Sequence, residues 1–145
     1  MTLAEKQAQL TVELAAFKNG QDRFALLVDR AKKIQLLAPE LRVEKNLIPG
    51  CLAKLWFVPS CRDEKCFFVC DSDSLVIKAI AGLLCDFYSG HAADEILVHD
   101  PNFLAPLGIT QHLTPNRRNA LSKVWECIRK FAENHLTPSS QRLQS

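Results

Sequence analysis

The sequence predicts one α+β domain in which a short antiparallel hairpin lies between two groups of helices. Three observations predict it: amphipathic helical segments before Pro39, two short apolar runs separated by a polar turn, and helical segments again after residue 74. Helices and strands grouped along the chain in this way are typical of the α+β class. The 145 residues, 48% hydrophobic and 23% charged, suffice for one core without a metal or disulfide framework.

Two amphipathic helices are expected at the N-terminus. The first spans residues 3–17, and Asn19 and Gly20 are expected to end it because both residues suit a helix C-terminus. The second spans residues 21–37 and is closed by Pro39, since the residue before a proline disfavours the helical conformation. The polar stretch that follows contains two prolines and is expected to be an extended connection leading to Cys51.

The hairpin is predicted from two short runs of apolar residues. The first run covers residues 55–58 and the second covers residues 65–70. Between them lies a polar turn that contains Pro59, Ser60, Arg62 and Asp63. Short apolar runs on either side of such a turn favour an antiparallel pair of strands.

The central helix is predicted over residues 75–88. Asp71, Ser72 and Asp73 precede it and supply the short oxygen side chains that cap helices. Apart from Lys78 and Asp86, this segment is apolar on nearly every side, and we therefore expect it in the middle of the domain.

The remainder is expected to be helical with breaks. Residues 92–98 favour a short helix and residues 102–108 a compact turn. Thr114 is expected to cap a long final helix that has Pro115 at its first position. The last residues, 137–145, are expected to fray.

The composition excludes several classes of function. A net charge of +2 is too mild for a protein whose main partner is nucleic acid. Glu126 and Glu133 interrupt the basic residues of the C-terminal part, which are expected to form a solvated face: Arg117, Arg118, Lys123, Arg129, Lys130 and Arg142. The N-terminus lacks a signal-peptide core, and no apolar run reaches the length of about 18 residues needed to span a membrane. We expect a cytoplasmic protein whose six cysteines are mostly thiols.

The cysteines are expected to differ in role. Four lie on predicted strands or helices and are expected to pack as small hydrophobic residues: Cys66, Cys70, Cys85 and Cys127. Cys51 instead follows Pro49 and Gly50 in a loop before the first strand. A thiol that attacks or carries sulfur needs access and thiolate character, and the loop supplies the access. Thiolate character would increase if Cys51 lay near Lys54 or near the start of the helix after Asp73.

A zinc or redox module is the alternative that the cysteines leave open. It would use Cys61, Cys66 and Cys70, which are separated by four and three residues rather than by the paired two-residue spacing of common zinc sites. Two of these residues also belong to a predicted strand. No cluster of glycines suggests a phosphate-binding loop.

Three segments of the sequence form a recognisable set: LIPGCLAKLWF, VCDSDSLVIKAIAGLL and ITQHLTPNRRNAL. A Pro-Gly-Cys loop leads into a strand with Trp56, Asp-Ser-Asp precedes a buried helix, and Gln-His-Leu-Thr-Pro with Arg117 opens the last helix. In this register they resemble the SufE family of sulfur acceptors, whose relatives include CsdE. The resemblance covers about residues 17–133 and implies a single SufE/NifU-like domain over residues 1–145, with a small antiparallel sheet flanked by helices.

The resemblance also implies a function. SufE-like proteins take sulfur from the persulfide of a PLP-dependent cysteine desulfurase (SufS-like), stimulate that enzyme and pass the sulfur to an iron–sulfur scaffold (SufB-like). Cys51 matches the cysteine that holds the persulfide, whereas Asp73 and Arg117 match positions near the docking face. The PLP belongs to the partner, so this chain is expected to hold no cofactor and to act as a carrier and activator. A loop that hides Cys51 at rest and turns outward on docking would shield the sulfur.

Some residues depart from the family pattern. Leu52 and Ala53 follow Cys51 where the family tends to have polar residues, and Ala79 and Ala120 replace common glycines. The nucleophile is retained, while the identity of the partner stays open.

Overall fold

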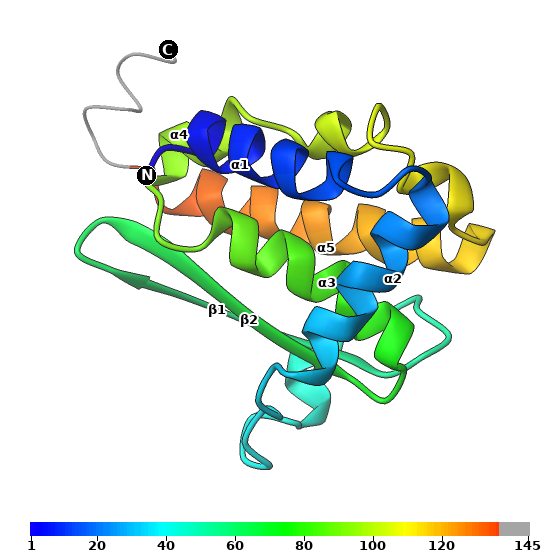
Figure 1. Cartoon of the computed structure of the whole chain (residues 1–145). Helices are drawn as coiled ribbons and strands as arrows, with labels where there is room; N and C mark the ends of the chain where they lie inside the picture. Colours follow the sequence, from blue (N-terminus) through cyan, green and yellow to red (C-terminus); the bar gives the residue numbers. More distant parts are fainter. Residues whose placement is uncertain (137–145) are drawn as a thin grey trace.

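The structure is a computed structural model that describes residues 1–136, and helix α3 (Leu75–Tyr88) lies at its centre. Helix α5 (Pro115–Asn134) and helix α2 (Gly20–Lys32) pack against α3, and the hairpin lies below it (Figure 1). Helix α1 (Leu3–Ala15) covers the opposite side. This arrangement confirms the predicted α+β class and the central position of the helix at residues 75–88. The tail expected to fray lies outside the described residues.

The junction between the first two helices differs from the prediction. Asn19 and Gly20 begin α2 instead of ending α1, because the Asn19 side chain accepts a hydrogen bond from the Asp22 backbone N–H at 2.8 Å. Asparagine suits both ends of a helix, so its presence alone does not tell which helix it belongs to. Helix α2 also ends at Lys32, before the predicted end at residue 37.

The two strands of the hairpin are longer than predicted. Strand β1 (Leu55–Arg62) pairs antiparallel with β2 (Lys65–Ser72), and the turn consists of Asp63 and Glu64. Both turn residues have positive φ, 52° and 64°, as a tight two-residue hairpin turn requires. The prediction of a turn at residues 59–63 therefore put the turn too early in the sequence, since residues 59–62 belong to β1. Pro59 lies within β1 opposite Phe68, where a strand of a two-stranded sheet tolerates a missing N–H.

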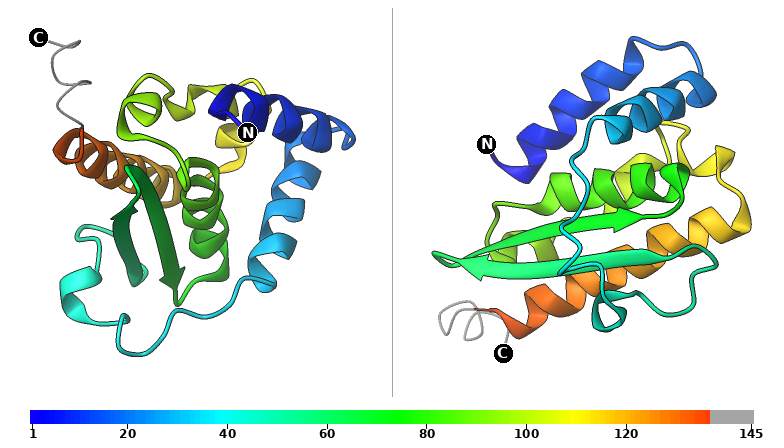
Figure 2. Two further views of the ribbon diagram at one scale, coloured as in Figure 1. Left: turned by 90° about the vertical axis from the view of Figure 1, so that its left-hand side faces the viewer. Right: turned by 90° about the horizontal axis from the view of Figure 1, so that it is seen from below.

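The hairpin is covered on both faces near its base. Phe57 and Phe68 face the helices and stack with ring centroids 5.8 Å apart. On the other face, the connection between α2 and β1 crosses the sheet (Figure 2), and the Arg42 guanidinium lies 4.3 Å from the centre of the Trp56 ring. Trp56 is consequently buried, although it points away from the helices.

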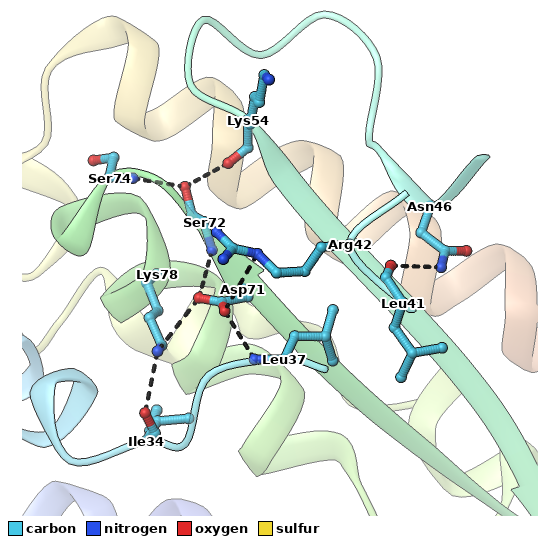
Figure 3. Close-up of polar contacts among 10 residues, drawn as sticks. All are labelled: Ile34, Leu37, Leu41, Arg42, Asn46, Lys54, Asp71, Ser72, Ser74 and Lys78. Atoms are coloured by element: carbon cyan, nitrogen blue, oxygen red, sulfur yellow. Dashed lines mark hydrogen bonds and ion pairs between the residues drawn. The ribbon is translucent and has the colours of Figure 1, made fainter. Parts of the chain in front are cut away.

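A fully buried carboxylate joins these parts of the chain. Asp71 accepts hydrogen bonds from the backbone N–H groups of Leu37 (2.9 Å) and Ser72 (2.8 Å), and it forms ion pairs with Lys78 (3.3 Å) and Arg42 (3.9 Å) (Figure 3). Burial by itself would raise the pKa of Asp71, but these hydrogen bonds and the Lys78 ammonium outweigh it and lower the pKa. The carboxylate is thus charged and paired in the folded protein.

The cap of α3 is Ser74, whose side chain accepts a hydrogen bond from the Ile77 N–H at 3.3 Å. The expectation that Asp71, Ser72 and Asp73 cap this helix is therefore wrong. Asp71 and Ser72 are the last residues of β2, and Asp73 lies between β2 and the capping Ser74. Thr114 does cap α5 as predicted, with Pro115 at the first helical position.

Short segments complete the fold: η1 (Glu44–Asn46), α4 (Ala93–Leu97), η2 (Pro101–Leu104) and η3 (Thr110–His112). Over residues 1–136, no helix combines the length and the apolar character that a membrane crossing requires.

Asp71→Asn should lower the free energy of unfolding by about 3 kcal/mol at neutral pH, because it leaves the buried Lys78 ammonium without its carboxylate. The pKa of Asp71 is lowered in the folded state, so its stabilisation is present above the unfolded pKa near 4 and is lost as the pH falls through the folded pKa. Denaturant unfolding of both proteins should therefore show a difference that shrinks below about pH 4.

Glu64→Gln is the matched control, because it removes a carboxylate from the exposed hairpin turn. It should leave the free energy of unfolding nearly unchanged. An equal loss of stability in Asp71→Asn and Glu64→Gln would contradict a special role for the buried carboxylate.

Candidate functional site

The Cys51 loop, residues 49–54, is closed at its base by backbone pairing. The Ile48 N–H donates to the Leu55 carbonyl at 2.8 Å, and Leu47 forms a bridge with Trp56. The residues between these pairs must leave the sheet edge and return to it. Gly50 has a φ of +82°, a backbone conformation that other residues rarely adopt, and it sets the turn just before Cys51.

The end of the β2 strand holds the far side of the Cys51 loop. The Lys54 N–H donates to Asp73 Oδ1 at 3.0 Å, and the Lys54 carbonyl accepts from Ser72 Oγ at 2.7 Å. Ser72 lies next to the buried Asp71, so the anchor of the loop is continuous with the polar cluster in the core (Figure 3). Asp73 is exposed and therefore both carries a surface charge and fixes the loop.

Helix α5 holds the near side of the Cys51 loop. Asn119 Nδ2 donates to the Gly50 carbonyl at 3.1 Å. The end of the Lys123 side chain lies against Gly50: a Cβ atom added there would be 2.9 Å from Lys123 Cε and 3.0 Å from Nζ. Sequence reasoning missed both residues and assigned Lys123 to a solvated face. The available signal was helical spacing, because Asn116, Asn119 and Lys123 follow one another at spacings of three and four residues on one side of α5.

A cavity of about 240 Å³ lies beside Cys51. Since a water molecule takes up about 30 Å³ of the liquid, the cavity has room for an added sulfur atom and part of a second side chain. It is lined by residues of the loop, of α3 and of the start of α5: Cys51, Leu52, Ala53, Ile77, Thr114, Asn116, Arg117 and Ala120. The structure thus brings Cys51 and Arg117 to one cavity, while Asp73 holds the loop from outside it.

Cys51 itself is half-buried, and its surroundings act on its charge in opposite directions. Burial raises the pKa of the Cys51 thiol, and the Lys123 ammonium partly counteracts this. The favourable charge therefore comes from α5 and not from Lys54, the neighbour considered from sequence. At rest the thiol is mostly protonated at physiological pH, so a reaction through its thiolate is slow unless its surroundings or the pH change.

The remaining cysteines do not form a metal centre. Cys66 and Cys70 are buried as predicted, whereas Cys61 is exposed. Cys66 and Cys70 lie four residues apart on β2, about 13 Å along the strand, which is too far for two ligands of one zinc ion. Within residues 1–136, no three His, Cys, Asp or Glu side chains are grouped so that they could hold a metal ion.

Cys85 and Cys127 are the two cysteines that lie on helices. Cys85 is buried in α3, and the neighbouring Cys70 together with burial raises the pKa of its thiol. Cys127 on α5 packs against the core as expected, but it is only half-buried and therefore less enclosed than Cys66, Cys70 and Cys85.

The chain is similar to several known proteins. The family described as "SufE: Fe-S metabolism associated domain" matches residues 8–132. An uncharacterized SufE-like protein of Synechocystis sp. is 24% identical over 90% of this chain and 82% of its own length. The cysteine desulfuration protein SufE of Wigglesworthia glossinidia brevipalpis is 26% identical over 88% of this chain and 90% of its own length.

Two other similarities add to these. SufE-like protein 1 of Arabidopsis thaliana, chloroplastic/mitochondrial, is 30% identical over 90% of this chain, which spans only 35% of that longer protein. The solution structure of a hypothetical protein from Thermus thermophilus superposes with a TM-score of 0.69, at 18% identity, over 93% of this chain and 98% of that one. This second similarity concerns the fold alone.

A thiol-alkylating reagent at neutral pH should modify the exposed Cys61 first, then Cys51, and only afterwards the buried Cys66, Cys70 and Cys85. Because burial raises the pKa of Cys51, its rate should keep increasing above about pH 8.5, the ordinary pKa of a free cysteine. Peptide mapping after timed alkylation measures each site separately. A Cys51 that reacts no faster than Cys85 in the native protein would contradict the accessibility described here.

Proposed function

Because the chain belongs to the SufE family and thereby has a role in iron–sulfur metabolism, we propose that it carries sulfur as a persulfide on Cys51. One observation carries the proposal. Cys51 lies in a loop anchored on both sides, through Asn119 and Asp73, and beside a cavity with room for an added sulfur atom. Buried thiols elsewhere in the chain lack this combination of access and support.

The transfer step is a displacement at sulfur. The Cys51 thiolate attacks the terminal sulfur of a cysteine persulfide on the donor, and the donor cysteine leaves as a thiolate. One S–S bond breaks and one forms, so no external oxidant or reductant is needed. The proton lost from Cys51 goes to solvent or to the departing thiolate. The same step, with Cys51 as the leaving group, passes the sulfur onward.

The donor we propose is a PLP-dependent cysteine desulfurase of the SufS-like class, and the final acceptor is an iron–sulfur scaffold of the SufB-like class. A relative is named a cysteine desulfuration protein, which supports a desulfurase partner. At the site, Leu52 has 86% of its surface exposed beside the nucleophile, and Arg117 forms no ion pair with any of residues 1–136. An exposed apolar side chain next to an unpaired cation is suited to a protein partner.

The loop also supports shielding of the sulfur between partners. At rest Cys51 is half-buried and its pKa is raised by burial, so it reacts slowly with small molecules. We propose that docking turns the loop outward, with Gly50 as the residue whose backbone permits the change. Removal of sulfur from the desulfurase would then stimulate its turnover, and this chain would act as an activator and carrier rather than as an independent enzyme.

Cys51→Ser should fold normally, accept no sulfur and fail to stimulate the desulfurase. Serine is nearly isosteric at this loop position, so the free energy of unfolding should change by less than about 1 kcal/mol. Its hydroxyl is a far weaker nucleophile at neutral pH and forms no stable persulfide. Intact mass after incubation with a cysteine desulfurase and cysteine, together with desulfurase turnover, measures both effects.

Two serine variants serve as controls. Cys61→Ser removes the most exposed thiol and should leave sulfur transfer unchanged, whereas Cys85→Ser places a hydroxyl in the core and should cost stability instead. If Cys51→Ser gains one sulfur atom at the wild-type rate, Cys51 is not the acceptor and the proposed function fails.

Charge reversal at Arg117 or Asp73 should change stimulation of the desulfurase without unfolding the protein. Arg117 lines the cavity beside Cys51, and the exposed Asp73 holds the other side of the Cys51 loop. Asp73→Asn separates two roles: it removes the charge but keeps an oxygen that accepts the Lys54 N–H, so it should affect docking without releasing the loop. Steady-state desulfurase kinetics at several carrier concentrations measure the apparent affinity.

Lys65→Glu is the control for this charge reversal. Lys65 lies at the opposite end of the hairpin, about 25 Å along the strands from the loop. Unchanged stimulation in both Arg117→Glu and Asp73→Lys would place the docking face elsewhere.

A further inference from the structure

The charged end of the Lys123 side chain on α5 lies against the Cys51 loop at Gly50. Its Cε and Nζ atoms would be 2.9 and 3.0 Å from a Cβ atom at Gly50, so glycine leaves the space that this side chain fills. One turn earlier on the same helix, Asn119 holds the Gly50 carbonyl at 3.1 Å. The loop therefore rests on a stretch of α5 that carries one cation at its contact point.

The Lys123 ammonium has no fixed partner within residues 1–136. None of these residues forms a hydrogen bond or ion pair with its Nζ atom. The basic residues that follow it on the helix are paired: Lys130 Nζ lies 2.9 Å from Glu126, and Arg129 lies 2.7 Å from Glu133. The Lys123 charge contributes to lowering the pKa of Glu126, but the Glu126 carboxylate is ion-paired with Lys130, so the half-buried Lys123 side chain is available to an anion beside it.

We propose that Lys123 supplies the positive charge that stabilises the anionic forms of Cys51, first its thiolate and then its persulfide. The persulfide part of this inference rests on the proposed function, whereas the thiolate part concerns the empty protein. The family pattern pointed to Cys51, Asp73 and Arg117 and gave Lys123 no role.

The charged and titratable groups around Cys51 come from three elements. Helix α5 contributes Lys123, Arg117 and, one turn beyond Lys123, the thiol of Cys127. The loop contributes Lys54, and the segment after β2 contributes Asp73, whose Oδ1 atom accepts the Lys54 N–H. Burial raises the pKa of Cys51, and Lys123 is the cation that opposes this increase.

The stabilisation should favour the loaded carrier over the empty one. A persulfide is more acidic than a thiol, and it is therefore anionic at neutral pH, where the empty Cys51 is mostly protonated. An adjacent ammonium interacts strongly with the anion and weakly with the neutral thiol. Lys123 thus shifts the exchange of sulfur with another cysteine toward Cys51, in addition to speeding attack by the thiolate.

The test compares Lys123→Met, Lys123→Arg and Lys130→Met with the wild type. The rate of Cys51 alkylation by iodoacetamide is followed by peptide mapping from about pH 6 to about pH 10, a range that brackets the ordinary thiol pKa. We expect Lys123→Met to react about threefold more slowly at neutral pH, the size of effect typical of a partly exposed charge pair, and to shift its profile to higher pH. Lys123→Arg should restore the wild-type profile, and Lys130→Met should leave it unchanged.

The variants separate a charge effect specific to Lys123 from a general change in the charge of α5. An unchanged profile in Lys123→Met, or an equal shift in Lys130→Met, would overturn the assignment. Arg117→Met tests the cation that lines the cavity, and a larger shift there than in Lys123→Met would also overturn the assignment. Thermal unfolding of each variant checks that the fold is retained, and this whole measurement uses neither desulfurase nor persulfide.

A second measurement addresses the loaded state. After exposure to the desulfurase and cysteine, the fraction of Lys123→Met that carries one added sulfur should be about threefold lower than that of the wild type. Equal loading would overturn the persulfide part of the inference. If wild-type Cys51 gains no sulfur at all, the proposed function fails, while the alkylation result still decides the role of Lys123 toward the thiolate.

Discussion

The buried carboxylate of Asp71 is the interaction on which the rest of the structure depends. Placing a charge in the core is costly unless cations and hydrogen-bond donors surround it, and this chain supplies them from three separate segments. Leu37 and Arg42 come from the connection between α2 and β1, Ser72 from the end of β2, and Lys78 from the central helix. One side chain thereby holds the connection, the sheet and α3 in a fixed relation, and the adjacent Ser72 extends this fixed relation to the Cys51 loop.

The Cys51 loop combines rigid attachment with local freedom. Its base is paired with the sheet and its two sides are tied to Asp73 and Asn119, so the position of the thiol is well defined. Between these anchors, Gly50 provides a backbone that can adopt conformations closed to other residues. Burial protects the thiol by keeping it protonated. The Lys123 ammonium acts in the opposite direction and favours the thiolate. A carrier that must hold sulfur and release it needs both properties.

Several features of the fold could be read from the sequence because they depend on local patterns. The apolar segment at residues 75–88 is a helix with those bounds. Thr114 and Pro115 begin α5, as the capping chemistry of these two residues indicates. The errors arose where one residue type serves two purposes. Asn19 suits either end of a helix, and Pro59 is typical of turns but is tolerated in β1, while the actual turn at Asp63 and Glu64 contains no glycine to mark it.

The sequence by itself determined the class of the fold, the choice of Cys51 as the reactive thiol candidate and the family to which the chain belongs. These follow from periodicity, from turn chemistry and from short motifs, all of which are properties of neighbouring residues. Only the tertiary structure decided which distant groups surround Cys51: Lys123 and Asn119 lie about 70 positions away along the chain. Their contacts exist because α3 and the hairpin place α5 beside the loop, and no local pattern encodes that approach.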